Sequence, residues 1–132
     1  FTPWLGTVLV RAIRNQDILI YNPDSLFNNV VDLEELSRFV SCVIDTGISG
    51  FEAVNLGADE PLTIRKVVEM FLSLTGSNSK ITEEAMTRRS FLINCAKVKS
   101  VFKFTPASTK SIIQRYVTGN LTELKGGKEA GR

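Results

Sequence analysis

Apolar residues recur every three or four positions along five stretches of this chain, a spacing typical of helices with one buried face. The pattern predicts helices over residues 3–14, 33–46, 64–75, 95–102 and 109–117. Each stretch follows residues that favour a helix start, and these are Thr2 with Pro3, Asp32, Thr63, Asn94 and Ser108. Gly47 and Gly76 follow two of the stretches, and a glycine in that position ends a helix well.

Short apolar runs between the helices predict extended segments. These segments are Ile18–Tyr21, Phe27–Leu33, Phe51–Leu56, Lys80–Thr82 and Phe91–Ile93. Turn-forming residues bound them, such as Asn22-Pro23-Asp24 after the first segment. The alternation of several helices with short strands predicts an α/β fold.

The second predicted helix begins with a charged cap. Asp32 is the expected N-cap and Glu35 lies three residues later, so the two form a capping box with carboxylates at the positive end of the helix dipole. Six apolar side chains then fall on one helix face, which we expect to be buried. They are Leu33, Leu36, Phe39, Val40, Val43 and Ile44.

Length and composition fit one globular domain, since the chain has 132 residues of which 43% are hydrophobic and 23% charged. We assign residues 1–120 to this domain and expect residues 121–132 to form a flexible tail. No apolar run approaches the roughly 20 residues that cross a bilayer, and no leader pattern opens the chain. We therefore expect a cytoplasmic protein without a membrane partner. Phe1 stands where Met would begin a gene product, which predicts a longer parent chain.

Charge and composition exclude several functions. The net charge of +2 is small and the basic residues are scattered, so we expect no nucleic-acid partner. The chain has no histidine, which excludes histidine-based catalysis and histidine-ligated metals. Cys42 and Cys95 are far apart in sequence and are expected to be plain thiols. We assign no catalytic residue and no metal ligand.

Three segments carry a family resemblance. They are Val31-Asp32-Leu33-Glu34-Glu35-Leu36, Ala53-Val54-Asn55-Leu56-Gly57 followed by Glu60-Pro61-Leu62-Thr63-Ile64, and Phe102-Lys103-Phe104-Thr105-Pro106. Their order resembles the C-terminal, substrate-binding half of the NAD-dependent epimerase/dehydratase family, the extended short-chain dehydrogenases that modify nucleotide sugars. Lys103 stands where that family usually has glycine, which would strain a left-handed turn.

The resemblance implies that the chain is the nucleotide-sugar-binding part of an enzyme, such as an isomerase, that uses NAD or NADP. The Gly-rich fingerprint of the N-terminal Rossmann half does not occur in the chain, and neither does the family's Tyr-x-x-x-Lys pair. We therefore expect a small substrate domain that binds no cofactor and turns nothing over by itself. Its expected partners are a nucleotide sugar and the Rossmann half.

The resemblance also implies substrate-binding residues. The backbones of Leu19 and Tyr21 occupy the strand that meets the nucleotide base. Asn28 falls where the family usually has an arginine on the diphosphate, and an amide brings neither charge nor a bidentate fork. Arg88 or Arg89 is the candidate for neutralising phosphate, and a solvated basic pair is an equal alternative.

A second function remains open, namely a freestanding, non-catalytic binding or interaction module of the same architecture. The apolar character of Phe51–Leu56 argues against this alternative, because it indicates that the chain is one part of a larger fold whose sheet covers this segment. Without that sheet we expect the chain to self-associate. The sequence leaves open the sugar, the nucleotide, the choice between NAD and NADP, and the choice between epimerase, dehydratase and reductase.

Overall fold

The computed structural model describes residues 3–87 and 91–129. The chain divides into two compact units, each built from segments distant in sequence. Unit 1 consists of Phe1–Ser25, Thr63–Arg89 and Ile113–Arg132. Unit 2 consists of Leu26–Leu62 and Ser90–Ile112.

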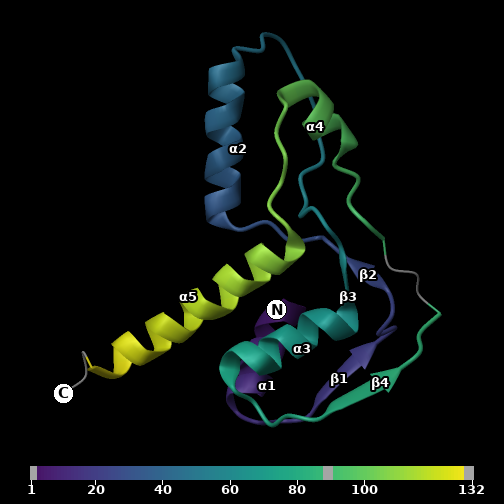
Figure 1. Cartoon of the computed structure of the whole chain (residues 1–132), viewed down its shortest axis with the longest axis vertical. Helices are drawn as coiled ribbons and strands as arrows, with labels where there is room; N and C mark the ends of the chain where they lie inside the picture. The colour runs from purple at the N-terminus through teal and green to yellow at the C-terminus, as the bar shows by residue number, and fades with distance from the viewer. Residues whose placement is uncertain (1–2, 88–90, 130–132) are drawn as a thin grey trace. The chain divides into compact units, whose positions relative to one another are not determined.

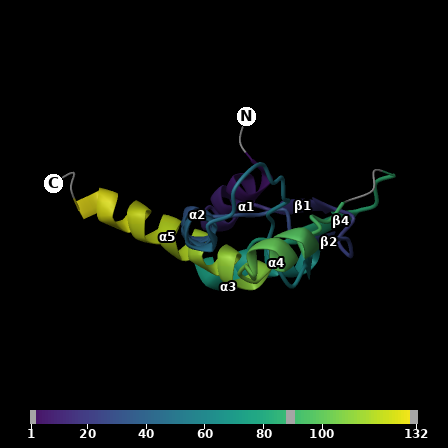
Figure 2. The ribbon, with the colours of Figure 1, turned by 90° about the horizontal axis from the view of Figure 1, so that it is seen from above.

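Unit 1 is built around a parallel pair of strands. Strand β1 (Ile18–Tyr21) pairs with β4 (Ile81–Glu84), with Leu19 opposite Thr82 and Tyr21 opposite Glu84. Helices α1 (Trp4–Ile13) and α3 (Ile64–Thr75) contact each other and both contact β1 (Figure 1, Figure 2). Two strands joined in parallel with helices against them match the α/β class predicted from the sequence.

The apolar face of α3 is buried as its spacing predicts, whereas Trp4 and Ile13 of α1 are each 38% exposed. Val67, Val68 and Phe71 of α3 are fully buried, and Ile18 and Ile20 fill the core beside them. Helix α5 (Thr109–Glu129) contributes Tyr116, whose ring centroid lies 6.1 Å from that of Phe71.

The ends of the unit 1 helices largely agree with the sequence. Thr63 caps α3 by accepting a hydrogen bond from the Lys66 amide, and the left-handed Gly76 ends it. The predicted start of α1 was one residue early, because Pro3 is its N-cap and not its first helical residue.

Unit 2 contains α2 (Leu33–Thr46) and α4 (Ala96–Phe102), which pack together. Its core is a cluster of Cys95, Val98, Phe102 and Phe104, against which Phe39 of α2 packs edge-to-face. The short strands β2 (Leu26–Phe27) and β3 (Leu62–Thr63) form the second two-stranded sheet.

Helix α2 departs from the prediction for its apolar face. Its caps are as expected, since Asp32 accepts from the Glu35 amide and Gly47 is left-handed. Phe39 and Val43 pack against the unit 2 core, but Leu33 is 84% exposed and Ile44 72% exposed. We call the exposed residues of this face the α2 stripe, which consists of Leu33, Leu36, Val40 and Ile44. The spacing predicts an apolar face correctly, but no described residue of unit 2 covers this part of it.

Three predicted extended segments are wrong or shortened. Phe51–Leu56 forms no strand, although exposure alternates over its second half, where Val54 and Leu56 are half-buried and Asn55 between them is exposed. Phe51 at its start is 91% exposed. A strand requires a backbone partner, and none of the described strands pairs with this segment. Of Phe27–Leu33 only Phe27 is in a strand, and Phe91–Ile93 is in none.

The described residues therefore form five helices and four short strands, and the predicted α/β class is confirmed. Helix α5 runs to Glu129, so residues 121–129 are helical, and the flexibility of this tail stays a prediction. No helix in the described ranges is long and apolar enough to span a membrane. Lys103 has φ +54°, so the left-handed turn predicted at this non-glycine position is present.

Candidate functional site

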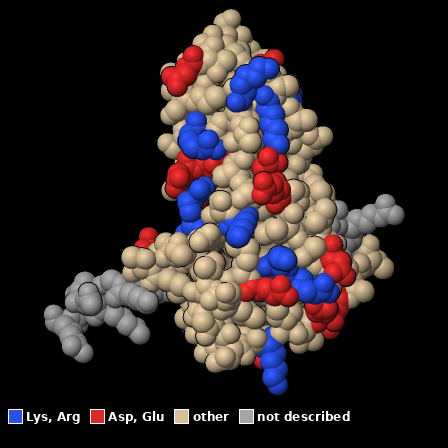
Figure 3. Space-filling view, in the orientation of Figure 1, with Lys and Arg blue, Asp and Glu red and all other residues tan. Residues whose placement is uncertain are grey.

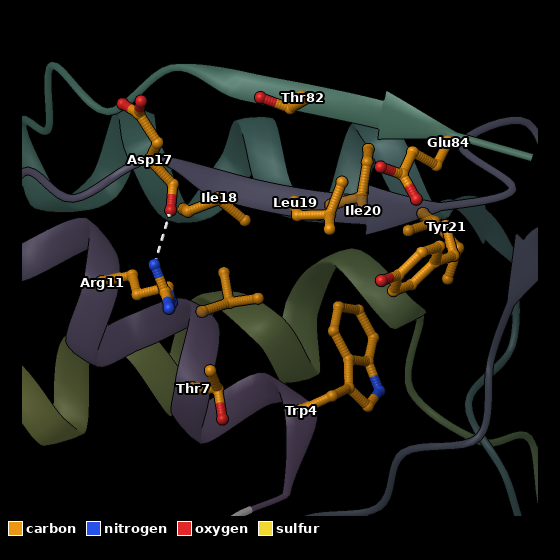
Figure 4. Close-up of a pocket in the computed structure, with 12 residues that line it drawn as sticks. Trp4, Thr7, Arg11, Asp17, Ile18, Leu19, Ile20, Tyr21, Thr82 and Glu84 are labelled. Carbon is orange, nitrogen blue, oxygen red and sulfur yellow. Dashed lines mark hydrogen bonds between the residues drawn. The ribbon is translucent and has the colours of Figure 1, made fainter.

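A pocket of about 820 Å³ opens in unit 1 between α1 and β1. Its volume lies within the roughly 300–1,000 Å³ of typical small-molecule sites. Helix α1 contributes side chains at helical spacing, and every residue from Asp17 to Tyr21 lines the pocket. Figure 4 shows β4 along one side of β1 and α1 along the other. The lining residues are Trp4, Thr7, Val8, Arg11, Asp17, Ile18, Leu19, Ile20, Tyr21, Ile64, Thr82 and Glu84.

Strand β1 presents a free edge to this pocket. The Ile18 amide donates to Lys80 O at 2.8 Å and the Asn22 amide donates to Glu84 O at 2.8 Å, so even-numbered residues face β4. Backbone groups of successive strand residues point to opposite sides, so those of Leu19 and Tyr21 point away from β4. The β1–β4 sheet has only these two strands among the described residues, so no third strand pairs with the outer edge of β1. Leu19 and Tyr21 therefore each offer an N–H donor and a C=O acceptor at the pocket.

The side chains of the strand pair divide between two faces. Ile18 and Ile20 point into the core of unit 1, whereas Leu19 and Tyr21 are each 45% exposed. Thr82 and Glu84 share the exposed face, because they stand opposite these two residues in the strand register. In Figure 4 the Trp4 indole, the Tyr21 ring and the Glu84 side chain lie around the same end of the pocket.

The cations near the pocket are engaged with other groups. Arg11 Nη1 donates to Asp17 O at 2.9 Å, which ties α1 to the start of β1. Arg65 of α3 binds two carboxylates, with Nε donating to Glu83 at 2.6 Å and Nη1 to Asp24. The hydrogen bond from Arg65 lowers the pKa of Glu83 below its usual range, and the two carboxylates raise the pKa of Arg65. Arg65 is therefore no ready phosphate ligand, whereas Arg11 keeps further N–H donors beyond the one bonded to Asp17.

Asn28 is a structural residue of unit 2. Its side chain is buried, and Nδ2 donates to Ala58 O at 3.0 Å and to Ile93 O at 2.9 Å. Its Oδ1 accepts from the Ile93 amide at 2.8 Å. Both N–H donors of the amide are used, so none remains for a phosphate. The geometry gives no support to the predicted phosphate contact and makes Asn28 a cross-link between two loops.

Arg88 and Arg89 lie outside the described residues, so their predicted phosphate contact stays a prediction. Of the five predicted site residues, the structure brings Leu19 and Tyr21 together at one pocket. It adds Trp4, Arg11 and Glu84, which the sequence analysis missed. Trp4 and Arg11 lie seven positions apart on one helix, a spacing that marks a shared face and is visible in the sequence.

The structure contains no cluster of three or more potential metal ligands among the described residues. On the face shown in Figure 3, acidic and basic side chains are interspersed, and they form no extended basic patch there. The pocket is thus the feature of unit 1 best suited to a small, largely uncharged ligand.

Comparison with protein-family models finds no match. No curated protein matches the sequence either. Solved structures do match by fold. A dTDP-glucose 4,6-dehydratase from Bacillus anthracis, solved with NAD, is 20% identical with a TM-score of 0.67, and the match covers 88% of this chain and 38% of that one. A UDP-glucose 4-epimerase from Thermotoga maritima, solved with UDP-glucose, is 14% identical with a TM-score of 0.74 over 93% of this chain and 40% of that one.

A third match is RMD from Pseudomonas aeruginosa complexed with NADPH, at 13% identity and a TM-score of 0.62. It covers 86% of this chain and 41% of that one. At such identities the matches establish the fold, and the chain has the fold of a part of these nucleotide-sugar dehydratases and epimerases. The predicted resemblance is confirmed at this level. The chain spans about two fifths of the length of the structures that it matches.

Proposed function

We propose that this chain is the nucleotide-sugar-binding part of an NAD- or NADP-dependent epimerase or dehydratase of the extended short-chain dehydrogenase family. One observation carries the proposal: the free edge of β1 opens into the unit 1 pocket, in a chain with the fold of part of such enzymes. The nucleoside of the substrate enters this pocket. The N–H and C=O groups of Leu19 and Tyr21 then hydrogen-bond the base.

Backbone recognition suits a flat heterocycle. Each nucleobase has donors and acceptors on its edge, and a strand edge offers both kinds at fixed spacing without a charged side chain. The Trp4 and Tyr21 rings beside the edge supply apolar surface for the faces of the base. Base stacking on an aromatic side chain contributes about 1–3 kcal/mol.

Catalysis requires groups that this chain does not supply. Hydride transfer in such enzymes uses a nicotinamide, and proton transfer uses a Tyr-x-x-x-Lys pair. In our proposal both belong to a Rossmann half in the same protein or in a partner chain. This chain then binds the substrate weakly by itself, because it forms only one wall of the site.

The Rossmann half also accounts for the exposed apolar surface of unit 2. Phe51–Leu56 alternates in exposure over its second half, as a strand would, but has no backbone partner among the described strands. The α2 stripe is apolar and exposed beside it in sequence. We propose that a sheet of the Rossmann half pairs with Phe51–Leu56 and that its apolar face covers the α2 stripe.

The test is an NMR titration of the ¹⁵N-labelled chain with five nucleoside monophosphates: UMP, dTMP, CMP, GMP and AMP. We expect at least one of them to shift the amide signals of Leu19 and Tyr21 at millimolar concentrations. Absence of any shift at these two amides with all five nucleotides would contradict the proposal.

A pair of variants separates backbone from side-chain recognition. Leu19→Pro removes the N–H at the free edge, where a proline is tolerated, and we expect it to abolish binding. Leu19→Ala keeps the N–H and should bind within a few-fold of wild type. If Leu19→Pro does not fold, an ester in place of the Ile18–Leu19 amide removes the same N–H with less disturbance. If the alanine variant and the variant without the N–H lose the same affinity for the nucleotide, the Leu19 side chain and not its backbone binds the base.

A further inference from the structure

The balance of charge in the unit 1 pocket points to the part of a nucleotide that it takes. Asp17 and Glu84 both line the pocket, and neither carboxylate makes an ion pair or side-chain hydrogen bond within the described residues. Within residues 3–87 and 91–129, Arg11 is the only Lys or Arg that lines the pocket, and its Nη1 donates to Asp17 O. With two carboxylates and one guanidinium, the charged side chains that line the pocket sum to −1, which disfavours a phosphate there. The uncharged nucleoside therefore enters, and the phosphates stay outside.

Glu84 lies where it can read the edge of a base. It stands opposite Tyr21 in the parallel register, so its side chain emerges on the same face of the sheet. Figure 4 shows its carboxylate beside the Tyr21 side chain at the end of the pocket. The neighbouring Glu83 points to the other face and is held by Arg65. The free edge of β1 and the Glu84 carboxylate line the same pocket, so a base inside it has backbone groups on one side and this carboxylate on another.

The bases differ in what they offer to a carboxylate, which only accepts hydrogen bonds. Guanine has two adjacent donors, N1–H and the exocyclic N2 amine, with the acceptor O6 next to them. Uracil and thymine place a single N–H between two carbonyls. Adenine and cytosine place their amine beside an unprotonated ring nitrogen. Guanine alone can donate two adjacent hydrogen bonds to one carboxylate while O6 accepts from a backbone N–H.

We infer that the pocket selects guanine nucleosides, with Glu84 accepting from N1–H and the N2 amine while the β1 edge donates to O6. This inference rests on the proposed function, and makes the substrate a guanosine diphosphate sugar. Hydrogen bonds to a charged acceptor are stronger than neutral ones. Because Glu84 is exposed, we expect a modest preference of about tenfold for guanosine over inosine, which lacks only the N2 amine.

The experiment measures dissociation constants from the Leu19 and Tyr21 amide shifts for GMP, IMP and UMP. Wild type should bind GMP about tenfold more tightly than IMP. Glu84→Gln keeps the shape but replaces one acceptor oxygen with a donor amine, and should bind GMP and IMP about equally. Glu69→Gln is the matched control, since Glu69 is exposed on α3 and does not line the pocket. It should keep the wild-type preference.

The outcomes separate this inference from the proposed function. Tighter binding of UMP than of GMP at the same two amides would overturn the guanine assignment and leave the proposed function in place. Equal weakening of all three nucleotides in Glu84→Gln would assign Glu84 to the ribose hydroxyls, and would also overturn it. Equal affinity of wild type for GMP and IMP overturns it without reference to any variant. If neither the five nucleotides of the first titration nor IMP shifts Leu19 and Tyr21, both proposals fail.

Discussion

Helix α3 in unit 1 and helix α2 in unit 2 are built in the same way but meet different surroundings. In each, a side-chain oxygen caps the first turn and a left-handed glycine follows the last. Yet α3 fully buries Val67, Val68 and Phe71, whereas α2 leaves Leu33 and Ile44 largely exposed. Caps and spacing therefore mark both helices, and the packing around each decides how much of its apolar face is buried.

The units also differ at their left-handed residues. Among residues other than glycine, unit 1 uses Asn15 and Asn22, and asparagine adopts this conformation more readily than larger side chains do. Asn15 Oδ1 accepts from the Asn78 amide at 2.8 Å, and Asn22 Oδ1 from the Met86 amide at 2.7 Å. Unit 2 uses Glu60 and Lys103. In unit 1 the side chains of the left-handed asparagines thus bond backbone that is distant in sequence, while unit 2 retains both exposed apolar surface and left-handed residues that are neither glycine nor asparagine.

The largest expected effect tests the contrast in burial with one substitution in each unit. Phe71→Ala removes a fully buried ring that packs on Tyr116, and should lower the free energy of unfolding by about 3–5 kcal/mol. Phe51→Ala removes a ring that is 91% exposed, and should change it by less than about 0.5 kcal/mol. Urea denaturation measures both. A cost above about 2 kcal/mol for Phe51→Ala would show that the ring is covered in solution.

The second prediction concerns the α2 stripe in the absence of a Rossmann half. We expect the chain to self-associate through this surface, because an uncovered apolar face finds cover in a second copy. Ile44→Glu should weaken association by about tenfold, or about 1.4 kcal/mol. Sedimentation velocity over a concentration series measures it.

Ser41→Glu is the control for that substitution, because it adds the same charge to an exposed position of α2 outside the stripe. It should associate like wild type. A chain that stays monomeric at the highest concentration contradicts the prediction, and equal weakening by both variants would assign the effect to net charge.

The third prediction tests the left-handed residues. Lys103→Gly relieves a side chain held at φ +54°, and should raise the free energy of unfolding by about 0.5–1 kcal/mol after the entropy of glycine in the unfolded chain is subtracted. Asn15→Gly should lower it, because the hydrogen bond to the Asn78 amide is lost. Thermal and urea unfolding measure the change in the free energy of unfolding for each variant. If Asn15→Gly raised that free energy, the contrast between the left-handed residues of the two units would be wrong.

The smallest expected effect is on pH dependence in unit 2. A hydrogen bond from Lys99, whose Nζ lies 2.8 Å from the Asp59 carboxylate, lowers the pKa of Asp59. Because the folded pKa is lower than the unfolded value of about 3.9, the pair stabilises the fold above that pH and loses this contribution as the pH falls below it. Asp59→Asn should reduce the acid sensitivity of unfolding. An unchanged pH profile below pH 5 in that variant would contradict the assignment.

Much of the fold was predictable because its signals are local. The Thr63 and Asp32 caps, the glycine ends and the strand Ile18–Tyr21 all depend on neighbours within a few residues. The strand Phe51–Leu56 was predicted wrongly for the opposite reason. Its alternation is present over its second half in the structure, but a strand is defined by hydrogen bonds to a partner, and no sequence pattern within the segment provides that partner.

The candidate site was predicted only in part. Leu19 and Tyr21 followed from the place of their strand in a familiar order of elements, and the structure puts both at the pocket. Glu84 was missed because its position opposite Tyr21 depends on a pairing between segments about sixty residues apart. Asn28 was assigned to phosphate by its register alone, and its contacts with Ala58 and Ile93 arise from long-range loop packing.

The sequence by itself determined where the helices begin to within one residue, where all but α5 end, which faces are apolar, and that histidine chemistry is excluded. Each of these is a property of residues close in the chain or of composition. The tertiary structure decided which apolar faces are covered, that the outer edge of β1 is free, and that Glu84 joins it at the pocket. These features depend on distances between segments remote in sequence, and such distances are set by packing and strand pairing.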